Sequence, residues 1–135
     1  MNGVHVVTCF LERNGEIAIL RRSSRVGTYR GHWAAVSGYI EAGVTPEEQA
    51  WQELAEEVGL SAQDATLVRE GATVEIADIE LRHKWVVHPF RFRLIDPSRI
   101  KLDWENTELR WVQPSAISSF DTVPGLFEVW QKVAD

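Results

Sequence analysis

The sequence predicts an α/β fold in which strands and helices pack in layers. Segments rich in β-branched and aromatic residues lie on both sides of one well-defined helical pattern, and a second helical pattern closes the chain. A chain of 135 residues with 44% hydrophobic residues and six Trp is long and apolar enough to bury a substantial core. Strands that alternate with helices in this way are typical of a layered α/β domain. We expect a single domain over residues 1–135.

The central helix is expected at residues 46–58. Thr45 is suited to be its N-cap, Pro46 favours the first helical position, and Glu48 completes a capping box with Thr45. Gly59 supplies a left-handed C-terminal stop. The sequence therefore sets both ends of this helix.

Turn signals and alternation place the other elements. Asn14 and Gly15 between two β-rich segments predict a tight hairpin, and the long polar segment 23–32 suggests a functional loop. The expected strands are residues 4–11, 17–22, 33–37, 66–79 with a bend, 85–94 with an interruption at Pro89, and 109–112. Residues 95–106 are expected to form a loop, 114–119 a helical turn and 124–134 a terminal helix.

The central helix carries an unusual acidic face. Glu53, Glu56 and Glu57 fall on one side at about 100° per residue. Like charges at this spacing repel one another, the last turn of a helix disfavours anions, and no Lys or Arg in the helix offsets either cost. A hard cation such as Mg²⁺ would reverse both penalties, because it prefers carboxylate oxygens. The alternative is a solvated acidic face on an acidic protein.

The segment Gly38–Leu60 resembles the Nudix box, G-x5-E-x7-R-E-U-x-E-E-x-G-U with U aliphatic. The matching residues are Gly38, Glu53, Leu54, Glu56, Glu57, Gly59 and Leu60. The chain departs from the box at Val44, where the pattern has glutamate, and at Gln52, where it has arginine. The preceding residues 33–41 also resemble the family's W-x-x-P-G-G-x-x-E approach to the box.

This resemblance implies an α/β/α sandwich with a mixed central sheet. It also implies that Glu53, Glu56 and Glu57, together with the carbonyl of Gly38, bind Mg²⁺, for which Mn²⁺ could substitute. The expected reaction is hydrolysis of a phosphoanhydride in a nucleoside diphosphate linked to another moiety. In such a reaction metal ions neutralise phosphate oxygens and lower the pKa of the attacking water.

The two departures from the box bear on activity. In the family, the box glutamate and arginine brace the loop against the helix; since both are absent here, neither leaves an unpaired charge. Gln52 is expected to hydrogen-bond the loop backbone instead. The acidic face favours an enzyme, whereas Val44 and Gln52 favour a second hypothesis, a catalytically weak Nudix-fold module that binds a nucleotide or a partner. A third hypothesis, an acidic interaction domain without metal, requires the box match to be accidental.

Several candidate site residues lie outside the box. Residues 104–112 resemble the family's late E-x-x-E-x-x-W segment, which makes Glu105 the first candidate for a general base or extra metal ligand and Glu108 the second. Arg22 is preferred over Arg21 as a phosphate contact, because alternation along a strand sends the two side chains to opposite faces. A solvated surface position is the alternative for each of them.

Three more residues are candidates for substrate contact. Arg30 lies in the polar loop and could bind a phosphate, although loop arginines are commonly solvated. Tyr39 follows the box glycine and could line the substrate entrance, with packing as its alternative role. Trp104 could stack on a nucleobase, with a core position as the alternative.

Charge and composition narrow the partners. The formal net charge of −6 argues against general nucleic-acid binding, so we expect a small-molecule nucleotide-type substrate that needs metal to approach the glutamates. The single Cys9 lies in an apolar run, which indicates a core thiol in a reducing, cytoplasmic compartment. No apolar stretch approaches the ~20 residues of a membrane span, and the first residues lack the order of a signal peptide. An apolar edge strand or the helix carrying Trp130 could support a homodimer.

Overall fold

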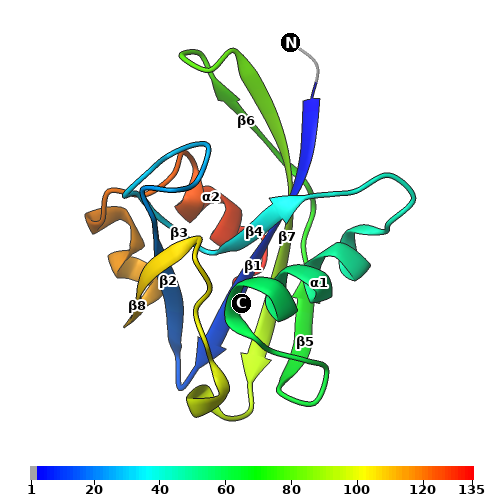
Figure 1. The fold of residues 1–135 in the computed structure, drawn as a ribbon, viewed down its shortest axis with the longest axis vertical. Coiled ribbons are helices and arrows are strands. Elements are labelled where there is room, and N and C mark those ends of the chain that lie inside the picture. Colours follow the sequence, from blue (N-terminus) through cyan, green and yellow to red (C-terminus); the bar gives the residue numbers. More distant parts are fainter. Residues whose placement is uncertain (1–2) are drawn as a thin grey trace.

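The computed structural model describes residues 3–135 and shows a mixed sheet with helices on its two faces (Figure 1). The strand order is β3-β2-β1-β7-β5, with β4 paired to β1, β6 to β7 and β8 to β2. The strands are β1 (Gly3–Arg13), β2 (Glu16–Arg22), β3 (Trp33–Ala34), β4 (Val36–Tyr39), β5 (Ala65–Glu70), β6 (Val74–Asp78), β7 (His83–Leu94) and β8 (Asn106–Val112). The helices are α1 (Pro46–Val58) and α2 (Leu126–Gln131), with 3₁₀ turns η1 (Pro97–Arg99) and η2 (Pro114–Ser119). The predicted α/β class is confirmed.

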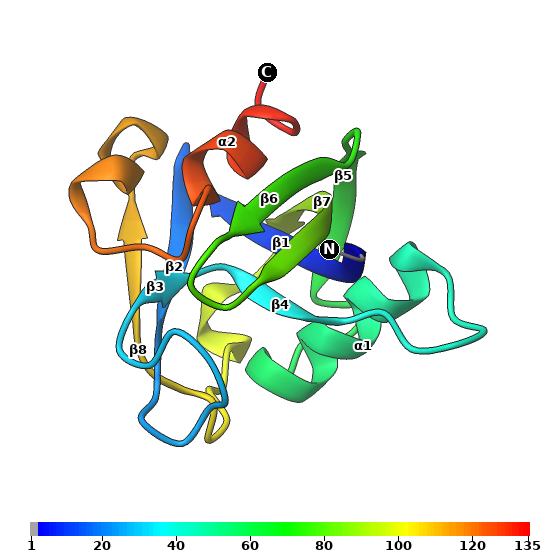
Figure 2. The same ribbon diagram turned by 90° about the horizontal axis from the view of Figure 1, so that it is seen from above.

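Two hydrophobic cores lie on opposite faces of the central strands β1 and β7, which run parallel from Gly3–Lys84 to Glu12–Arg93. Figure 2 shows α1 on one face and α2 on the other. Alternation along the strands fills both cores: Phe90 and Phe92 belong to the core under α1, whereas Phe10 belongs to the core under α2. Cys9 is buried in the core under α1, as expected for a core thiol. Within residues 3–135, no helix is long and apolar enough to cross a membrane.

One edge of β1 is shared by two strands that diverge. Val6–Cys9 pair with β4, whereas Glu12 and Arg13 pair with β2 through the predicted hairpin. At the turn, Asn14 and Gly15 both have positive φ (51° and 79°), as a tight hairpin of this kind requires. Since β4 and β2 leave β1 at different points, a gap separates the wall that carries α1 from the wall formed by β2 and β8. The functional site described below lies along this gap.

The caps predicted for α1 are all present. The Thr45 side chain accepts a hydrogen bond from the Glu48 N–H (3.1 Å), and the Glu48 carboxylate accepts one from the Thr45 N–H (3.2 Å). Gly59 is left-handed (φ 69°) and ends the helix. Ala50, Leu54 and Val58 are completely buried, so this stripe fixes the rotation of α1 and thereby the direction of its glutamates.

Three expectations for the second half of the chain need correction. The strand expected at 66–79 is two strands, β5 and β6, which share the outer edge of β7. Pro89 does not interrupt β7; its carbonyl accepts a hydrogen bond from Gly71 (3.0 Å), so its missing N–H falls at the break between β5 and β6, where no ladder bond is lost. The terminal helix is shorter than 124–134, because Gly125 is left-handed (φ 73°) and α2 begins only at Leu126.

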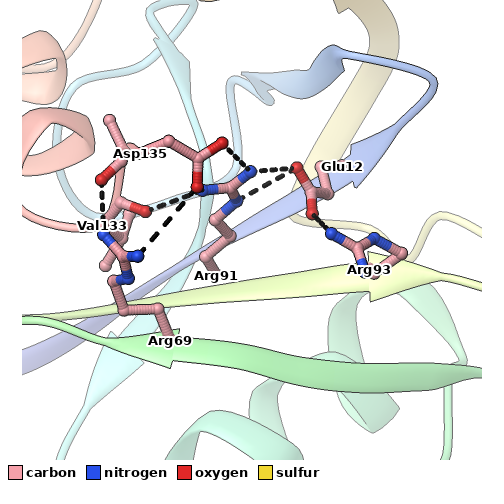
Figure 3. A network of polar contacts seen from close by, with 7 residues as sticks. Glu12, Arg69, Arg91, Arg93, Val133 and Asp135 are labelled. Carbon is pink, nitrogen blue, oxygen red and sulfur yellow. Dashed lines mark hydrogen bonds and ion pairs between the residues drawn. The ribbon is translucent and has the colours of Figure 1, made fainter.

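A buried ion-pair network fastens the C-terminal residues to the sheet (Figure 3). Arg91 on β7 is 6% exposed and donates to the Glu12 carboxylate (2.7 and 3.0 Å), to the Val133 carbonyl (3.0 Å) and to Asp135 (2.9 Å). Glu12 also accepts a hydrogen bond from Arg93 (3.0 Å). Glu12 is the one buried carboxylate of this network, whereas Asp135 is exposed, so the Glu12–Arg91 pair is the part that is shielded from solvent.

The substitution Glu12→Gln should lower the free energy of unfolding by about 3 kcal/mol, because it leaves the buried Arg91 guanidinium with only the exposed carboxylate of Asp135 as a partner. Urea denaturation at neutral pH measures the change. Asp135→Asn removes the exposed partner of the same arginine and serves as the matched control, with a smaller loss expected. Equal losses for the two variants would show that burial does not set the strength of this pair.

Candidate functional site

The Glu53 carboxylate packs directly against Gly38 of β4. A Cβ at position 38 would overlap this carboxylate, so only glycine permits the contact. Glu53 is 8% exposed, although α1 presents it toward the gap between the two walls. The first residue of the predicted box and a glutamate of its helix are thereby brought together in space.

Glu57 lies one turn further along α1 and is 3% exposed. One carboxylate oxygen, Oε2, accepts a hydrogen bond from the Ser37 backbone N–H (3.1 Å), and Oε1 accepts one from the Asn106 side-chain amide (3.2 Å). Asn106 was not expected as a site residue. Its signal in the sequence was its place directly after the candidate Glu105. In the structure, the register of β8 with β2 pairs Asn106 with Arg22.

Gln49 is a second site residue that the sequence analysis missed. It is 1% exposed, accepts a hydrogen bond from the backbone N–H of Glu41 in the box loop (3.1 Å) and donates one to Glu53 (2.9 Å). The neutral amide of Gln49 therefore links the box loop to α1 and also hydrogen-bonds Glu53, a candidate metal ligand. The available signal was its position four residues before Glu53, which places both side chains on one helix face.

Gln52 does not bond the loop backbone as expected. Its amide donates to the side chains of Glu41 (3.3 Å) and Glu56 (3.2 Å) at the surface of the site. Val44 is half-buried, and its backbone N–H bonds the Glu41 carbonyl (3.1 Å) within the loop. The bracing that the box arginine and glutamate would give is thus supplied by Gln49 and, at the surface, by Gln52.

Burial raises the pKa of both inner glutamates. For Glu57, the charges of Glu105 and Glu53 raise the pKa further. For Glu53, interactions with Glu57 and the hydrogen bond from Gln49 oppose the rise, whereas the charges of Glu56 and Glu105 add to it. Burial also raises the pKa of Glu105, with Asp103 adding to the rise and Arg22 opposing it. Burial and neighbouring acids thus both disfavour the ionised form of these carboxyl groups. A bound cation would stabilise that ionised form.

The carboxylates fit a cation that takes few protein ligands. Among residues 3–135, no three His, Cys, Asp or Glu side chains already converge on one point to hold a metal ion. Glu53 and Glu57 are close enough for each to shift the pKa of the other, whereas Glu56 is exposed and bonded to Gln52. Mg²⁺ is commonly held by one or two carboxylates, with waters and substrate phosphates completing its octahedron. Glu53, Glu57 and the Gly38 backbone suit that mode of binding.

A cavity of about 430 Å³ runs along the gap beside these carboxylates. Glu53 and Glu56 line it from α1, and Arg22 and Glu105 line it from the wall of β2 and the loop before β8. The Arg22 Nε donates to the Thr28 carbonyl (2.9 Å), which fixes the guanidinium at this wall. Acidic groups and one arginine therefore share the same end of the cavity.

The other predicted contact residues divide into two groups. Tyr39 and Trp104 both line the cavity and are 57% and 53% exposed, so part of each ring is open to a ligand, although the Arg25 guanidinium lies over the Trp104 ring. Arg30 is not among the lining residues; its Nε bonds the Val26 carbonyl (2.8 Å) inside its own loop. Glu108 is also absent from the lining and pairs with Arg110 (3.0 Å).

In the presence of a chelator, the protein should lose stability as the pH rises above the ordinary carboxyl range. The folded state holds protons on Glu53 and Glu57 more tightly than the unfolded state, so stability falls as the pH rises through their raised pKa values. Glu53→Gln keeps the bond from Gln49 and removes one charge, so at pH 8 it should raise the free energy of unfolding by on the order of 1 kcal/mol.

Urea denaturation of parent and variant at pH 5 and pH 8, both with chelator, checks this pH dependence. The gain should be small at pH 5 and larger at pH 8. Glu47→Gln, at an exposed position of the same helix, is the control. A Glu53→Gln variant that is less stable than the parent at pH 8 would show that the buried charge is not a cost.

Comparison with known proteins agrees with this geometry. The family model described as NUDIX domain matches residues 1–132. A putative 8-oxo-dGTP diphosphatase 3 of Mycobacterium tuberculosis is 29% identical over 126 residues, which cover 89% of this chain and 55% of that protein. The chain thus spans about half the length of the curated relatives that it matches.

Two solved structures share the fold at low sequence identity. The MutT protein from Methanosarcina mazei Go1 has a TM-score of 0.80 at 21% identity, over 96% of this chain and 91% of that one. The NUDIX domain of Shewanella oneidensis NrtR, complexed with ADP ribose, has a TM-score of 0.75 at 12% identity, over 98% and 87%. Because the family model covers nearly the whole length and the fold agrees, the chain belongs to the Nudix family.

Proposed function

We propose that the protein is a Mg²⁺-dependent hydrolase that cleaves a phosphoanhydride bond in a nucleoside diphosphate linked to another moiety. The observation that carries this proposal is the contact of Glu53 with Gly38 beside the buried Glu57. The cavity next to this contact also has Arg22 and Glu105 on its wall. A buried acidic pair next to a phosphate-binding arginine suits a substrate that arrives with a divalent cation.

Each residue has a distinct role in this proposal. Glu53, Glu57 and the Gly38 carbonyl hold Mg²⁺, with Glu56 at the exposed side. When bound, the ion neutralises phosphate oxygens and lowers the pKa of water. Arg22 uses Nε for Thr28 and has further N–H groups for phosphate oxygens.

Glu105 is the proposed general base. Its backbone is fixed by hydrogen bonds from Glu105 N–H to Asp103 (3.0 Å) and from Ser23 N–H to the Glu105 carbonyl (2.8 Å). Burial and Asp103 raise the pKa of Glu105, which makes its carboxylate a stronger proton acceptor than an ordinary glutamate. Its side chain lines the cavity across from Glu53, on the wall where an attacking water would need a proton acceptor.

A nucleotide-type substrate is supported by the named relatives and by the size of the cavity. One relative is named as a putative 8-oxo-dGTP diphosphatase, and one structural neighbour was crystallised with ADP ribose. A volume of about 430 Å³ lies in the range of sites that bind small organic ligands.

The competing proposal is a catalytically weak Nudix-fold module that binds a nucleotide or a partner. Val44 and Gln52 motivate it, because they remove the charged brace of the box. Gln49 argues for the enzyme, since it bonds the Glu41 backbone and Glu53 together without any charge. The loop therefore keeps its attachment to the metal-binding helix.

A panel of nucleotides, dinucleoside polyphosphates, nucleotide sugars and capped RNA, assayed with Mg²⁺ and with chelator, tests the function. Turnover should require Mg²⁺, and Glu57→Gln should lower kcat/KM by about 100-fold, because metal contributes several kcal/mol to such reactions. Glu47→Gln should retain activity. Activity that survives both chelator and Glu57→Gln would overturn the mechanism, and tight nucleotide binding without any turnover would favour the module.

Gly38→Ala tests the metal site separately from turnover. The added Cβ would displace the Glu53 carboxylate, so affinity for Mn²⁺, measured by electron paramagnetic resonance, should fall by about 10-fold or more. Gly27→Ala is the matched control, because nothing lies within 4 Å of the Cβ that it would add. Unchanged Mn²⁺ affinity in Gly38→Ala would show that the Gly38–Glu53 contact does not hold the ion.

A further inference from the structure

The cavity has two chemically different ends. The charged side chains that line it form the phosphate end: Arg22, Glu41, Glu53, Glu56 and Glu105. The other end is formed mainly by apolar side chains of the core under α2. Its apolar residues are Val6, Ile76, Val87, Leu126 and Val129. We call this part the apolar end.

The polar atoms of Tyr29 and Trp85, two aromatic residues that line the apolar end, are already engaged. The Trp85 indole N–H donates to the Tyr29 hydroxyl (3.0 Å), and that hydroxyl donates to Asp78 (2.5 Å). Burial and the bond to Asp78 raise the pKa of Tyr29 to about 12, so the hydroxyl keeps its proton at neutral pH. Trp85 therefore offers a ligand its ring and not its N–H.

Among the described lining residues, no Asn, Gln, His or Lys side chain is present. Apart from the charged groups of the phosphate end, the polar side-chain groups still open to a ligand are hydroxyls, such as those of Thr8 and Tyr39, and the single indole N–H of Trp104. A hydroxyl both donates and accepts, so it can serve the edge of any base. Selective reading of a base instead uses fixed donor and acceptor pairs from amide or guanidinium groups.

We propose that the apolar end binds the nucleobase by ring stacking and apolar contact without reading its hydrogen-bonding edge, so that the enzyme selects substrates by their phosphate chain and accepts different bases. This inference rests on the function proposed above. The Tyr39 and Trp85 rings, with centroids 6.1 Å apart and planes inclined by 46°, form the corner against which the base packs. A site without matched polar groups cannot reject an analogue that differs by one polar substituent as strongly as a site built to hydrogen-bond it.

Binding of nucleoside monophosphates tests the inference without depending on turnover. Isothermal titration with Mg²⁺ compares AMP, GMP, 8-oxo-GMP, CMP and UMP, with ribose 5-phosphate as the probe that has no base. Affinities for the five nucleotides should agree within about tenfold, and ribose 5-phosphate should bind at least tenfold more weakly. A preference of more than 100-fold for one base, or equal binding of ribose 5-phosphate, would overturn the inference.

Two substitutions at Tyr39 separate its ring from its hydroxyl. Tyr39→Leu removes the ring at an exposed position and should weaken all five nucleotides alike, by about tenfold. Tyr39→Phe keeps the ring, and Thr8→Val removes a second open hydroxyl, so neither should change the ratio of affinities among the bases. A change of more than tenfold in that ratio, in either variant, would show that a hydroxyl reads the base.

Hydrolysis assays on the corresponding diphosphate substrates keep this inference apart from the proposed function. Mg²⁺-dependent turnover with a strong preference for one base would overturn the inference and leave the function standing. Equal binding of all five nucleotides with no turnover of any substrate would overturn the function and support the inference.

Discussion

The site depends on the burial of two carboxylates side by side, Glu53 and Glu57, against a glycine that leaves room for one of them. Ionised acids in such a place repel each other and lose solvation, and the apolar stripe of α1 prevents them from turning away. Even the Cys9 thiol beneath them has its pKa raised by burial and by both glutamates. The fold thus maintains a concentration of negative charge that a bound cation would stabilise.

The same constraint explains why the site lies where the sheet divides. β1 pairs with β4 over Val6–Cys9 and with β2 only at its end, and the cavity lies between the walls on either side. One wall carries the buried acids on α1, and the other carries Arg22 and Glu105. The charged side chains line one end of this cavity, and apolar side chains of the core under α2 line the other end. A single cavity therefore has a polar end and an apolar end.

The local signals of the sequence predicted the helix and its direction, because caps, turns and the 3.6-residue period are set by neighbours in the chain. Thr45, Gly59 and the Asn14–Gly15 turn behave as their types require. Long-range partners were not predictable in this way. The split into β5 and β6 opposite Pro89 depends on the register of β7, and Asn106 meets Glu57 only because β8 pairs with β2. Arg30 was expected at the substrate, but a bond inside its own loop holds it elsewhere.

The altered bracing changes the charge balance of the site more than its shape. An arginine at position 52 would place a permanent positive charge on α1 beside the glutamates, whereas Gln52 contributes only a dipole. Gln49 keeps the loop in place through two hydrogen bonds, so the geometry survives the exchange. No basic residue of α1 then shares in neutralising Glu53 and Glu57, and this compensation falls to the cation and, across the cavity, to Arg22. A neutral brace therefore makes the acidic pair more dependent on its metal, because geometry alone cannot offset the charge.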